Sequence, residues 1–277
     1  MTELSYNINE HDYFAWDAAS NSTLSRMKKS PAHCKAYLDM PVEPTAAMRI
    51  GSLIHKRVLE PSLFDDSYLL TPEGIDRRTK VGKAAWAEFQ EILNGREPIK
   101  SNELLLANMI SDSIDAHPAA SHYLDGGRAE VSAFWQDPEF DFPCKCRFDF
   151  LSNTGYIVDL KTTQDASATE FAKSIYKFGY HRQAAMYMDG HTQCTGITPK
   201  GFVFIAVEKE PPYAVGVYVL DAESIALGRE EYRELLAEFA KCKLENNWPA
   251  YSSEVQELSL PNWVFAQREN DVVEGIV

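Results

Sequence analysis

Two strand-like segments joined by a tight turn constrain this chain more than any other part of its sequence. The segments FPCKCRFDFLS (142–152) and GYIVDLK (155–161) are rich in aromatic and β-branched residues, and NTG between them is a turn signal. Each apolar run contains an acid, Asp149 in the first and Asp159 in the second. A strand that returns after a turn of this length can bring the two carboxylates side by side.

The charges of the second segment are expected on one face of its strand. Because residues two apart on a strand share a face, Asp159 and Lys161 project together. The opposite face can pack on the core and carries Tyr156, Val158 and Leu160. For D-x-K alone, a cross-strand ion pair at a sheet edge is the competing interpretation.

The same alternation makes a prediction for the first segment. Phe148 and Phe150 should share one face of that strand. Arg147, Asp149 and Leu151 should share the other face. The two segments together have the pattern D-x9-D-x-K. Paired carboxylates suit Mg²⁺ or Mn²⁺, and a nearby lysine can orient a metal-bound water or stabilise phosphate charge.

Two further pairs on predicted helices could serve the same chemistry. GSLIH places Gly51 and His55 four residues apart on one helix face, and the histidine can ligate a metal or bond a phosphate. HRQAAMY places Gln183 and Tyr187 four apart, within reach of a phosphate or a water. Taken singly, the favoured interpretations are a surface or core histidine for the first pair and an ordinary amphipathic helix for the second.

Length and pattern predict one globular domain over residues 1–277, of the α/β class with a mixed sheet flanked by helices. Residues 1–125 read as mostly helical, with one helix from Ser22 or Thr23 towards Leu38 that breaks near Pro31, and others over 45–60, 78–93 and 102–116. Residues 126–250 form the expected catalytic core. Strands over 128–137, 142–152 and 155–161 should make an antiparallel meander, followed by two helices, two strands and a helix from Ala222. Residues 251–277 carry no strong pattern and are expected to be a tail.

Composition limits the partners and the compartment. No apolar run is long enough to span a membrane and the N-terminus lacks a signal-peptide pattern, so a soluble cytoplasmic protein of a bacterial or phage-infected cell is expected. The net charge of −14 argues mildly against nucleic acid, yet basic residues gather at 25–35, 76–83 and 173–182. The five cysteines are expected to be reduced thiols without an iron–sulfur cluster.

The ordered motifs G-x3-H, D-x9-D-x-K and Q-x3-Y resemble the PD-(D/E)XK nuclease superfamily. More narrowly, with DLKTT, LSRMKKSPAHC and EVSAFW, the chain resembles the RecE-type (exonuclease VIII-like) phage recombination exonucleases, which are related to lambda exonuclease. The likeness spans about residues 20–251. No proline precedes Asp149 and the second acid is Asp159 rather than a glutamate, but aspartate supplies the same oxygen ligands.

The resemblance implies a restriction-endonuclease-like core and a Mg²⁺-dependent 5′-to-3′ exonuclease of double-stranded DNA, with Mn²⁺ able to substitute. An endonuclease of the same superfamily and a non-catalytic DNA-binding protein are the alternatives. The implied metal ligands are the carboxylates of Asp149 and Asp159, the carbonyl of Leu160, and His55. Lys161 would position the attacking water, and Gln183 and Tyr187 would support the water or the phosphate.

Further residues and partners also follow from the resemblance. Glu130 would support the ligands or bind the metal itself, although a surface carboxylate is equally compatible with the sequence. Relatives bind a DNA end through hydroxyl and basic groups, for which the candidates here are Ser22, Ser25, Arg26, Arg77, Arg78, Lys80, Thr162 and Thr163. Relatives also form trimeric or tetrameric rings around DNA and act with a single-strand annealing protein. A ring with a basic inner surface would reconcile DNA binding with the acidic net charge.

Overall fold

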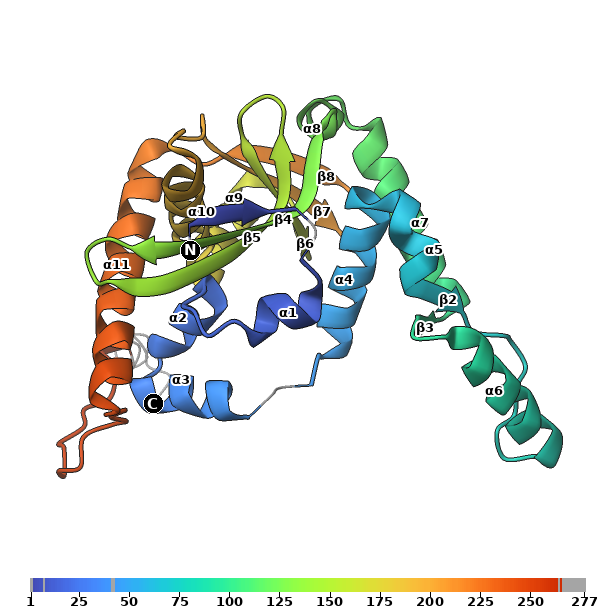
Figure 1. Ribbon diagram of the computed structural model, residues 1–277, viewed down its shortest axis with the longest axis horizontal. Coiled ribbons are helices and arrows are strands. Elements are labelled where there is room, and N and C mark those ends of the chain that lie inside the picture. Colours follow the sequence, from blue (N-terminus) through green and yellow to red (C-terminus); the bar gives the residue numbers. More distant parts are fainter. Residues whose placement is uncertain (1, 7, 41–42, 264, 266–277) are drawn as a thin grey trace, which may run out of the picture.

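A six-stranded mixed sheet forms the centre of the molecule (Figure 1), in a computed structural model that describes residues 2–6, 8–40, 43–263 and 265. The spatial order of its strands is β1-β4-β5-β6-β7-β8. Their bounds are β1 Glu3–Ser5, β4 Gly127–Asp137, β5 Phe142–Ser152, β6 Ile157–Thr163, β7 Phe202–Glu208 and β8 Val215–Val219. Only β6 and β7 pair in parallel, and the other neighbours are antiparallel. The predicted α/β fold with a flanked mixed sheet is confirmed.

The antiparallel meander predicted from the sequence is the β4-β5-β6 unit. Strand β5 pairs with β4 along nearly its whole length, and β6 returns beside β5 after the NTG turn. The chain then crosses over through two helices before β7 pairs in parallel with β6. The site-bearing strands β5 and β6 therefore lie in the interior of the sheet, where both faces are covered.

Helices cover both faces of the sheet and enclose two cores. On one face lie α2 (Asn21–Met27), α9 (Ala168–Phe178), α10 (Tyr180–Thr195) and α11 (Ala222–Glu245), which pack with Trp135, Phe148 and Phe204. On the other face lie α4 (Ala46–Leu59), α5 (Phe64–Ser67), α7 (Ser101–Ala116) and α8 (Pro118–Leu124), which pack with Phe150, Leu160 and Ile205. The remaining helices of the described chain are α1 Glu10–Ala15, α3 Pro31–Asp39, the 3₁₀ turn Pro61–Leu63 and α6 Lys80–Leu93.

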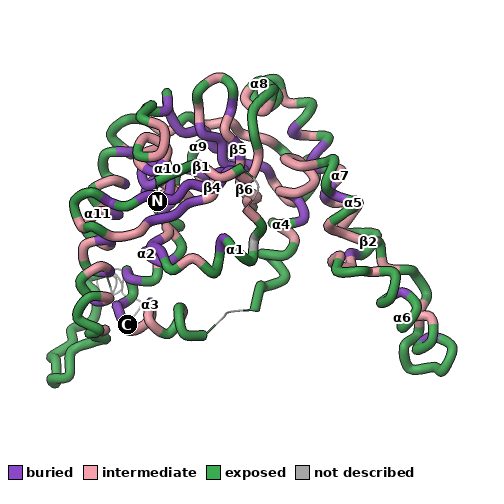
Figure 2. Tube along the Cα trace, in the orientation of Figure 1, coloured by how far each residue is buried: buried purple, intermediate pink, exposed green. Residues whose placement is uncertain are grey.

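An arm projects from the body on the α4 side, as Figures 1 and 2 show. It consists of a parallel pair of short strands, β2 (Tyr68–Leu70) and β3 (Glu97–Ile99), and of α6 at its far end. Helix α6 is largely exposed and begins at Lys80, because the Thr79 side chain accepts a bond from the N–H of Gly82. The sequence predicted the helix but neither strand.

The helix starts near the N-terminus differ from expectation. Ser20, rather than Ser22 or Thr23, caps α2 by accepting from the N–H of Thr23. The helix ends at Met27, and Ser30 caps a separate helix that begins at Pro31. The predicted break near Pro31 is therefore present, and Pro31 starts the second helix because its missing N–H is unneeded in a first turn.

One prediction about strand β5 is wrong: Phe148 and Phe150 do not share a face. Phe148 packs in the core with Trp135, whereas Phe150 packs in the opposite core with Leu160. The regular pairing is interrupted between them, where Asp149 lies opposite a residue with a left-handed backbone. A strand that departs from its pleat at one residue no longer keeps the two-residue alternation across it.

In the described part of the chain, no helix is long and apolar enough to cross a membrane. Of the predicted tail, residues 251–263 are exposed, and position 264 and positions 266–277 lie outside the described residues.

Candidate metal-binding active site

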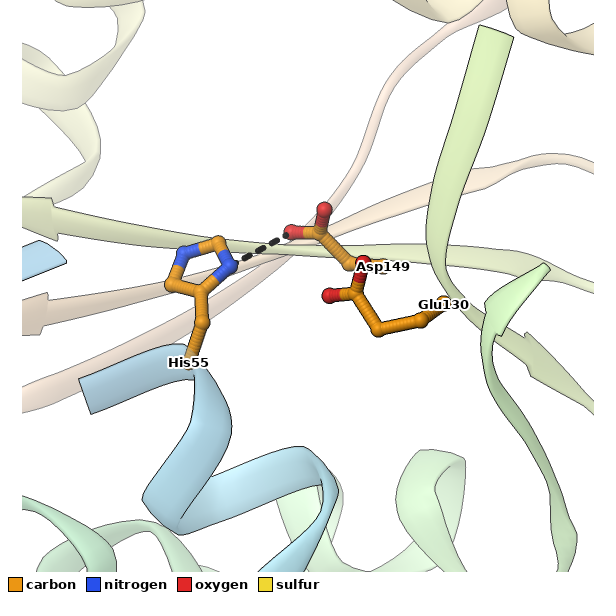
Figure 3. Close-up of side chains that lie close together, drawn as sticks. All are labelled: His55, Glu130 and Asp149. Atoms are coloured by element: carbon orange, nitrogen blue, oxygen red, sulfur yellow. Dashed lines mark ion pairs between the residues drawn. The ribbon is translucent and has the colours of Figure 1, made fainter. Parts of the chain in front are cut away.

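Three ligand-type side chains from three elements meet at the middle of the sheet (Figure 3): His55 of α4, Glu130 of β4 and Asp149 of β5. Their ligand atoms all lie within 4.8 Å of one another, and all three residues are partly buried. Nδ1 of His55 lies 3.5 Å from Oδ2 of Asp149. Two carboxylates and an imidazole around a common point form a ligand set that can hold a cation.

The backbone opens a gap in the sheet at this point. Pairing of β5 with β6 is recorded for Phe150–Val158 and Leu151–Ile157, and the strands separate before Asp149 reaches the level of Asp159. Oδ2 of Asp149 fills the gap by accepting from the N–H of Leu160 at 2.9 Å. Because the N–H and C=O of a strand residue point to the same side, the Leu160 carbonyl faces the gap too.

Glu130 reaches the cluster from a strained backbone. Its φ of +52° lies in the left-handed region, which costs a non-glycine residue of order 1–3 kcal/mol. It interrupts the pairing of β4 with β5 between Ala129–Phe150 and Val131–Phe148. Such strain persists where the surroundings hold it in place, and it gathers at functional sites. The sequence predicted Glu130 as a supporting or ligand residue, and the structure places it directly beside Asp149 and His55.

Asp159 and Lys161 lie beside the three-residue cluster but are engaged differently. Oδ2 of Asp159 lies 2.6 Å from Nζ of Lys161, and Oδ1 accepts from Nε2 of Gln183 at 2.6 Å. Asp159 is 1% exposed, so this pair is largely shielded from water. Asp159 is outside the set of three mutually close ligands, although the carboxylate of Asp149 is near enough to affect its pKa. The structure thus brings the predicted Gln183 onto the predicted carboxylate.

The electrostatics favour binding of a cation. Burial, together with the neighbouring carboxylate of Asp149, raises the pKa of Glu130 to about 8 against the opposing effect of Arg147. Burial and Asp149 also raise the pKa of Asp159. Burial disfavours the charged form of Lys161, but Asp159 and Asp149 outweigh it, so the pKa of Lys161 is raised. Carboxylates that are costly to ionise together gain most from a bound divalent ion.

Tyr187, the other predicted residue of α10, is placed less directly. Its ring packs edge-on against Phe148 at 5.6 Å and against Phe202 at 6.3 Å. Burial raises the pKa of its hydroxyl well above the usual value, and the carboxylates of Asp159 and Asp149 add to the effect. The hydroxyl therefore stays protonated.

The sequence did not identify Tyr180, which follows the turn after α9. Nζ of Lys161 lies 4.7 Å from the centroid of its ring, a cation–π distance. The helical pattern of the sequence predicts only that Tyr180 is a half-buried aromatic residue. Its only sequence signal is position, three residues before Gln183, which places both side chains on one face of the helix.

The predicted DNA-binding residues lie in three places. Thr162 and Thr163 follow Lys161 on β6 and line a cavity. Ser22, Ser25 and Arg26 lie on α2, with the guanidinium of Arg26 over the ring of Tyr37. The last group, Arg77, Arg78 and Lys80, lies at the start of α6 on the projecting arm. Figure 1 shows that this helix is far from β5 and β6.

Comparison of the sequence with protein-family profiles gives a match over residues 20–261, to the family described as PDDEXK-like domain of unknown function (DUF3799). The chain belongs to this family. The predicted superfamily is thereby confirmed, and the match covers both the N-terminal helices and the sheet. None of the curated proteins with which the sequence was compared matches it.

One solved structure has the same fold. The chain is similar to an exonuclease candidate from Eubacterium rectale, with a TM-score of 0.65 and 14% identity, over 94% of this chain and 98% of that one. At this identity the likeness shows the fold alone. An alkaline exonuclease from Laribacter hongkongensis also matches at 17% identity, over 62% of this chain and 86% of that one, but its TM-score of 0.28 carries no argument.

The donor set fits a divalent metal ion. Glu130 and Asp149 offer carboxylate oxygens, His55 offers an imidazole nitrogen, and the Leu160 carbonyl faces the same gap. Oxygen donors of this kind suit Mg²⁺ or Mn²⁺ better than a soft metal. Within the described residues, the five cysteines are all free thiols.

Proposed function

We propose that this protein is a Mg²⁺-dependent 5′-to-3′ exonuclease of double-stranded DNA, of the RecE type. It would leave 3′ single-stranded overhangs for phage-type homologous recombination, and Mn²⁺ would replace Mg²⁺. The observation that carries the proposal is the convergence of His55, Glu130 and Asp149 in the gap beside the buried Asp159–Lys161 pair. A carboxylate cluster next to a lysine is what hydrolysis of a phosphodiester by a metal-bound water requires.

Each residue of the site has a proposed role. The metal, held by His55, Glu130 and Asp149, would polarise the scissile phosphate and lower the pKa of a bound water. Asp159 fixes the position of Lys161, whose ammonium would orient the attacking water. Asp159 would be a further ligand through Oδ2, the oxygen that also pairs with Lys161.

The helix α10 supports this arrangement. Gln183 donates to Asp159 and so holds the carboxylate in one rotamer. The hydroxyl of Tyr187 would face the phosphate or the water. Both residues act through orientation, because neither carries a charge that could balance the reaction.

DNA would approach along the hydroxyl and basic groups of β6, α2 and the arm. Thr162 and Thr163 directly follow the catalytic lysine on β6, so their hydroxyls are the candidates for contact with the phosphates next to the cleaved bond. We propose a ring of three or four subunits in which Arg77, Arg78 and Lys80 of each arm contact the duplex. A single-strand annealing protein in the cytoplasm would take up the overhang.

The test is digestion of end-labelled linear duplex carrying either a 5′ phosphate or a 5′ hydroxyl, with Mg²⁺ and with EDTA. Loss of the 5′ label with Mg²⁺ only is expected, and Asp159→Asn should abolish it while the circular dichroism spectrum stays unchanged. Cleavage of a covalently closed circle would instead indicate an endonuclease. DNA binding without any cleavage would indicate a non-catalytic protein. A monomer by light scattering at micromolar concentration would remove the ring.

A further inference from the structure

An aromatic row leads from the catalytic lysine to the surface. Nζ of Lys161 lies over the ring of Tyr180, and the centroid of Tyr180 lies 5.6 Å from that of Phe178. Nζ of Lys177 lies 5.3 Å from the centroid of Phe178. Gly179, with a φ of +73°, ends α9 and starts α10, and its left-handed turn brings the two flanking rings together.

The outer part of this row is exposed. Phe178 is 53% exposed, and Tyr176 in the preceding turn of α9 is 67% exposed. Tyr176 stacks on His181 of α10 with an interplanar angle of 19°, so it too is held rather than free to rotate. Large rings that are ordered yet open to solvent beside an active site are suited to stacking on a ligand.

A cavity of about 570 Å³ lies between this row and strand β6. It adjoins the candidate active site, because the ring of Tyr180, which lines it, lies beside Nζ of Lys161. Its lining combines hydroxyls, ammonium groups and aromatic rings from Thr162, Thr163, Lys173, Ser174, Lys177, Phe178, Tyr180 and Lys209.

The charges of the cavity are unequally satisfied. Lys173 pairs with Glu170 at 2.5 Å, and Asp165 accepts from the N–H of Ser167. Neither Lys177 nor Lys209 makes an ion pair with a carboxylate in the described part of the chain. In a chain of net charge −14, two ammonium groups left without a carboxylate beside exposed rings indicate an anionic, ring-bearing ligand.

We propose that this cavity binds an unpaired segment of the DNA strand next to the cleaved phosphate. One base stacks on Phe178, and the adjoining phosphates contact Lys177 and Lys209. The proposal rests on the proposed nuclease function and names the surface that holds its substrate strand. Stacking of a base on an aromatic ring contributes about 1–3 kcal/mol. It tolerates any base, which suits an exonuclease that removes nucleotides of every sequence.

The first test measures binding of a fluorescent ten-nucleotide oligothymidylate by anisotropy in EDTA, so that no cleavage occurs. Phe178→Ala and Phe178→Leu should both weaken binding by about five-fold to a hundred-fold. Phe178→Trp should bind as tightly as the unaltered protein, because it keeps an aromatic face. Phe14→Ala, which removes a 65% exposed phenylalanine on α1, is the matched control and should change nothing.

The second test measures how binding depends on salt. The slope of log K against log salt is negative, and removing one phosphate contact reduces its magnitude by about 0.7 for single strands. Lys177→Ala combined with Lys209→Ala should therefore reduce the magnitude by about 1.4. Lys241→Ala, an exposed residue of α11, controls for net charge and should leave the slope unchanged.

The outcomes separate this inference from the nuclease proposal. No binding of the oligonucleotide by the unaltered protein, or equal binding by all Phe178 variants, would overturn the inference even if linear duplex is digested. Weakened binding to blunt duplex but not to the single strand would also contradict it. Conversely, Phe178-dependent binding in a protein that never cleaves DNA would support this cavity and refute the nuclease.

Discussion

Carboxylates on the α11 side of the molecule and carboxylates at the candidate site are neutralised in different ways. On the α11 side each buried or half-buried acid has its own arginine. Nη2 of Arg229 lies 2.8 Å from Asp189, Nη1 of Arg182 lies 2.6 Å from Glu231, and Arg233 pairs with Asp137. These pairs join α11 to α10 and to the end of β4, so they tie the helix to the body of the fold.

The candidate site lacks that compensation. No arginine forms an ion pair with Glu130 or Asp149 among the described residues, and the imidazole of His55 lies beside Asp149 instead. Lys161 forms its ion pair with Asp159. The contrast teaches that negative charge is balanced where it only supports structure and is left unbalanced where a metal ion is expected.

The largest effect is expected from removing the charge of Asp149. Asp149→Asn keeps the shape but takes away a ligand, so Mg²⁺-dependent cleavage should fall by about a thousand-fold, beyond the 10–100-fold typical of residues that only support a ligand. Turnover of labelled linear duplex measures it. Activity within ten-fold of the unaltered enzyme would show that the charge contrast is unrelated to catalysis.

Breaking an arginine pair should lower stability and leave cleavage unchanged. Arg233→Met leaves Asp137, which is 3% exposed, without its counter-charge and should lower the free energy of unfolding by about 2–3 kcal/mol. Urea denaturation measures the loss. Cleavage per folded molecule should stay unchanged, and a large loss of activity would place this pair in the catalytic machinery. Lys241→Ala provides the control for a removed surface charge.

Adding the metal should stabilise only the site that needs it. Mn²⁺ at a hundred times its dissociation constant should raise the free energy of unfolding by about 2.7 kcal/mol. In Asp149→Asn that gain should disappear, whereas in Arg233→Met it should persist on a lower baseline. Thermal unfolding with and without Mn²⁺ distinguishes the two. Equal stabilisation of both variants would mean that the ion binds elsewhere.

A smaller effect is expected from the residue that only orients Asp159. Gln183→Leu removes the 2.6 Å bond to Oδ1 and should slow cleavage by about ten-fold, with metal affinity little changed. Gln183→Glu would add a fourth carboxylate next to Asp159 and should be worse. A variant Gln183→Leu as fast as the unaltered enzyme would show that Lys161 alone positions the carboxylate.

Much of the fold could be read from residue patterns. The bounds of β5 agree with the segment 142–152, and the helix with His55 begins within a residue of its prediction, because strong periodicity and clear turn signals mark these elements. The three-residue strands β1, β2 and β3 were missed. Segments that short carry no period and depend on pairing with distant parts of the chain.

The site was predictable in its residues but less so in its geometry. The alternation rule placed Asp159 and Lys161 correctly on one face, opposite Val158 and Leu160. The rule failed at Phe150, because it assumes an uninterrupted pleat. Nothing in the sequence indicates that a glutamate will adopt a left-handed backbone, so the direct approach of Glu130 to Asp149 became visible only in three dimensions.

The left-handed backbone of Glu130 means that a substitution that stabilises the fold at this position also removes a proposed metal ligand. Glycine adopts a φ of +52° without penalty, and asparagine does so at little cost, so either substitution relieves the local strain. Each would also remove a carboxylate from the cluster. A selection for heat resistance alone would therefore favour substitutions at position 130, and the more stable protein would lack one of the proposed metal ligands.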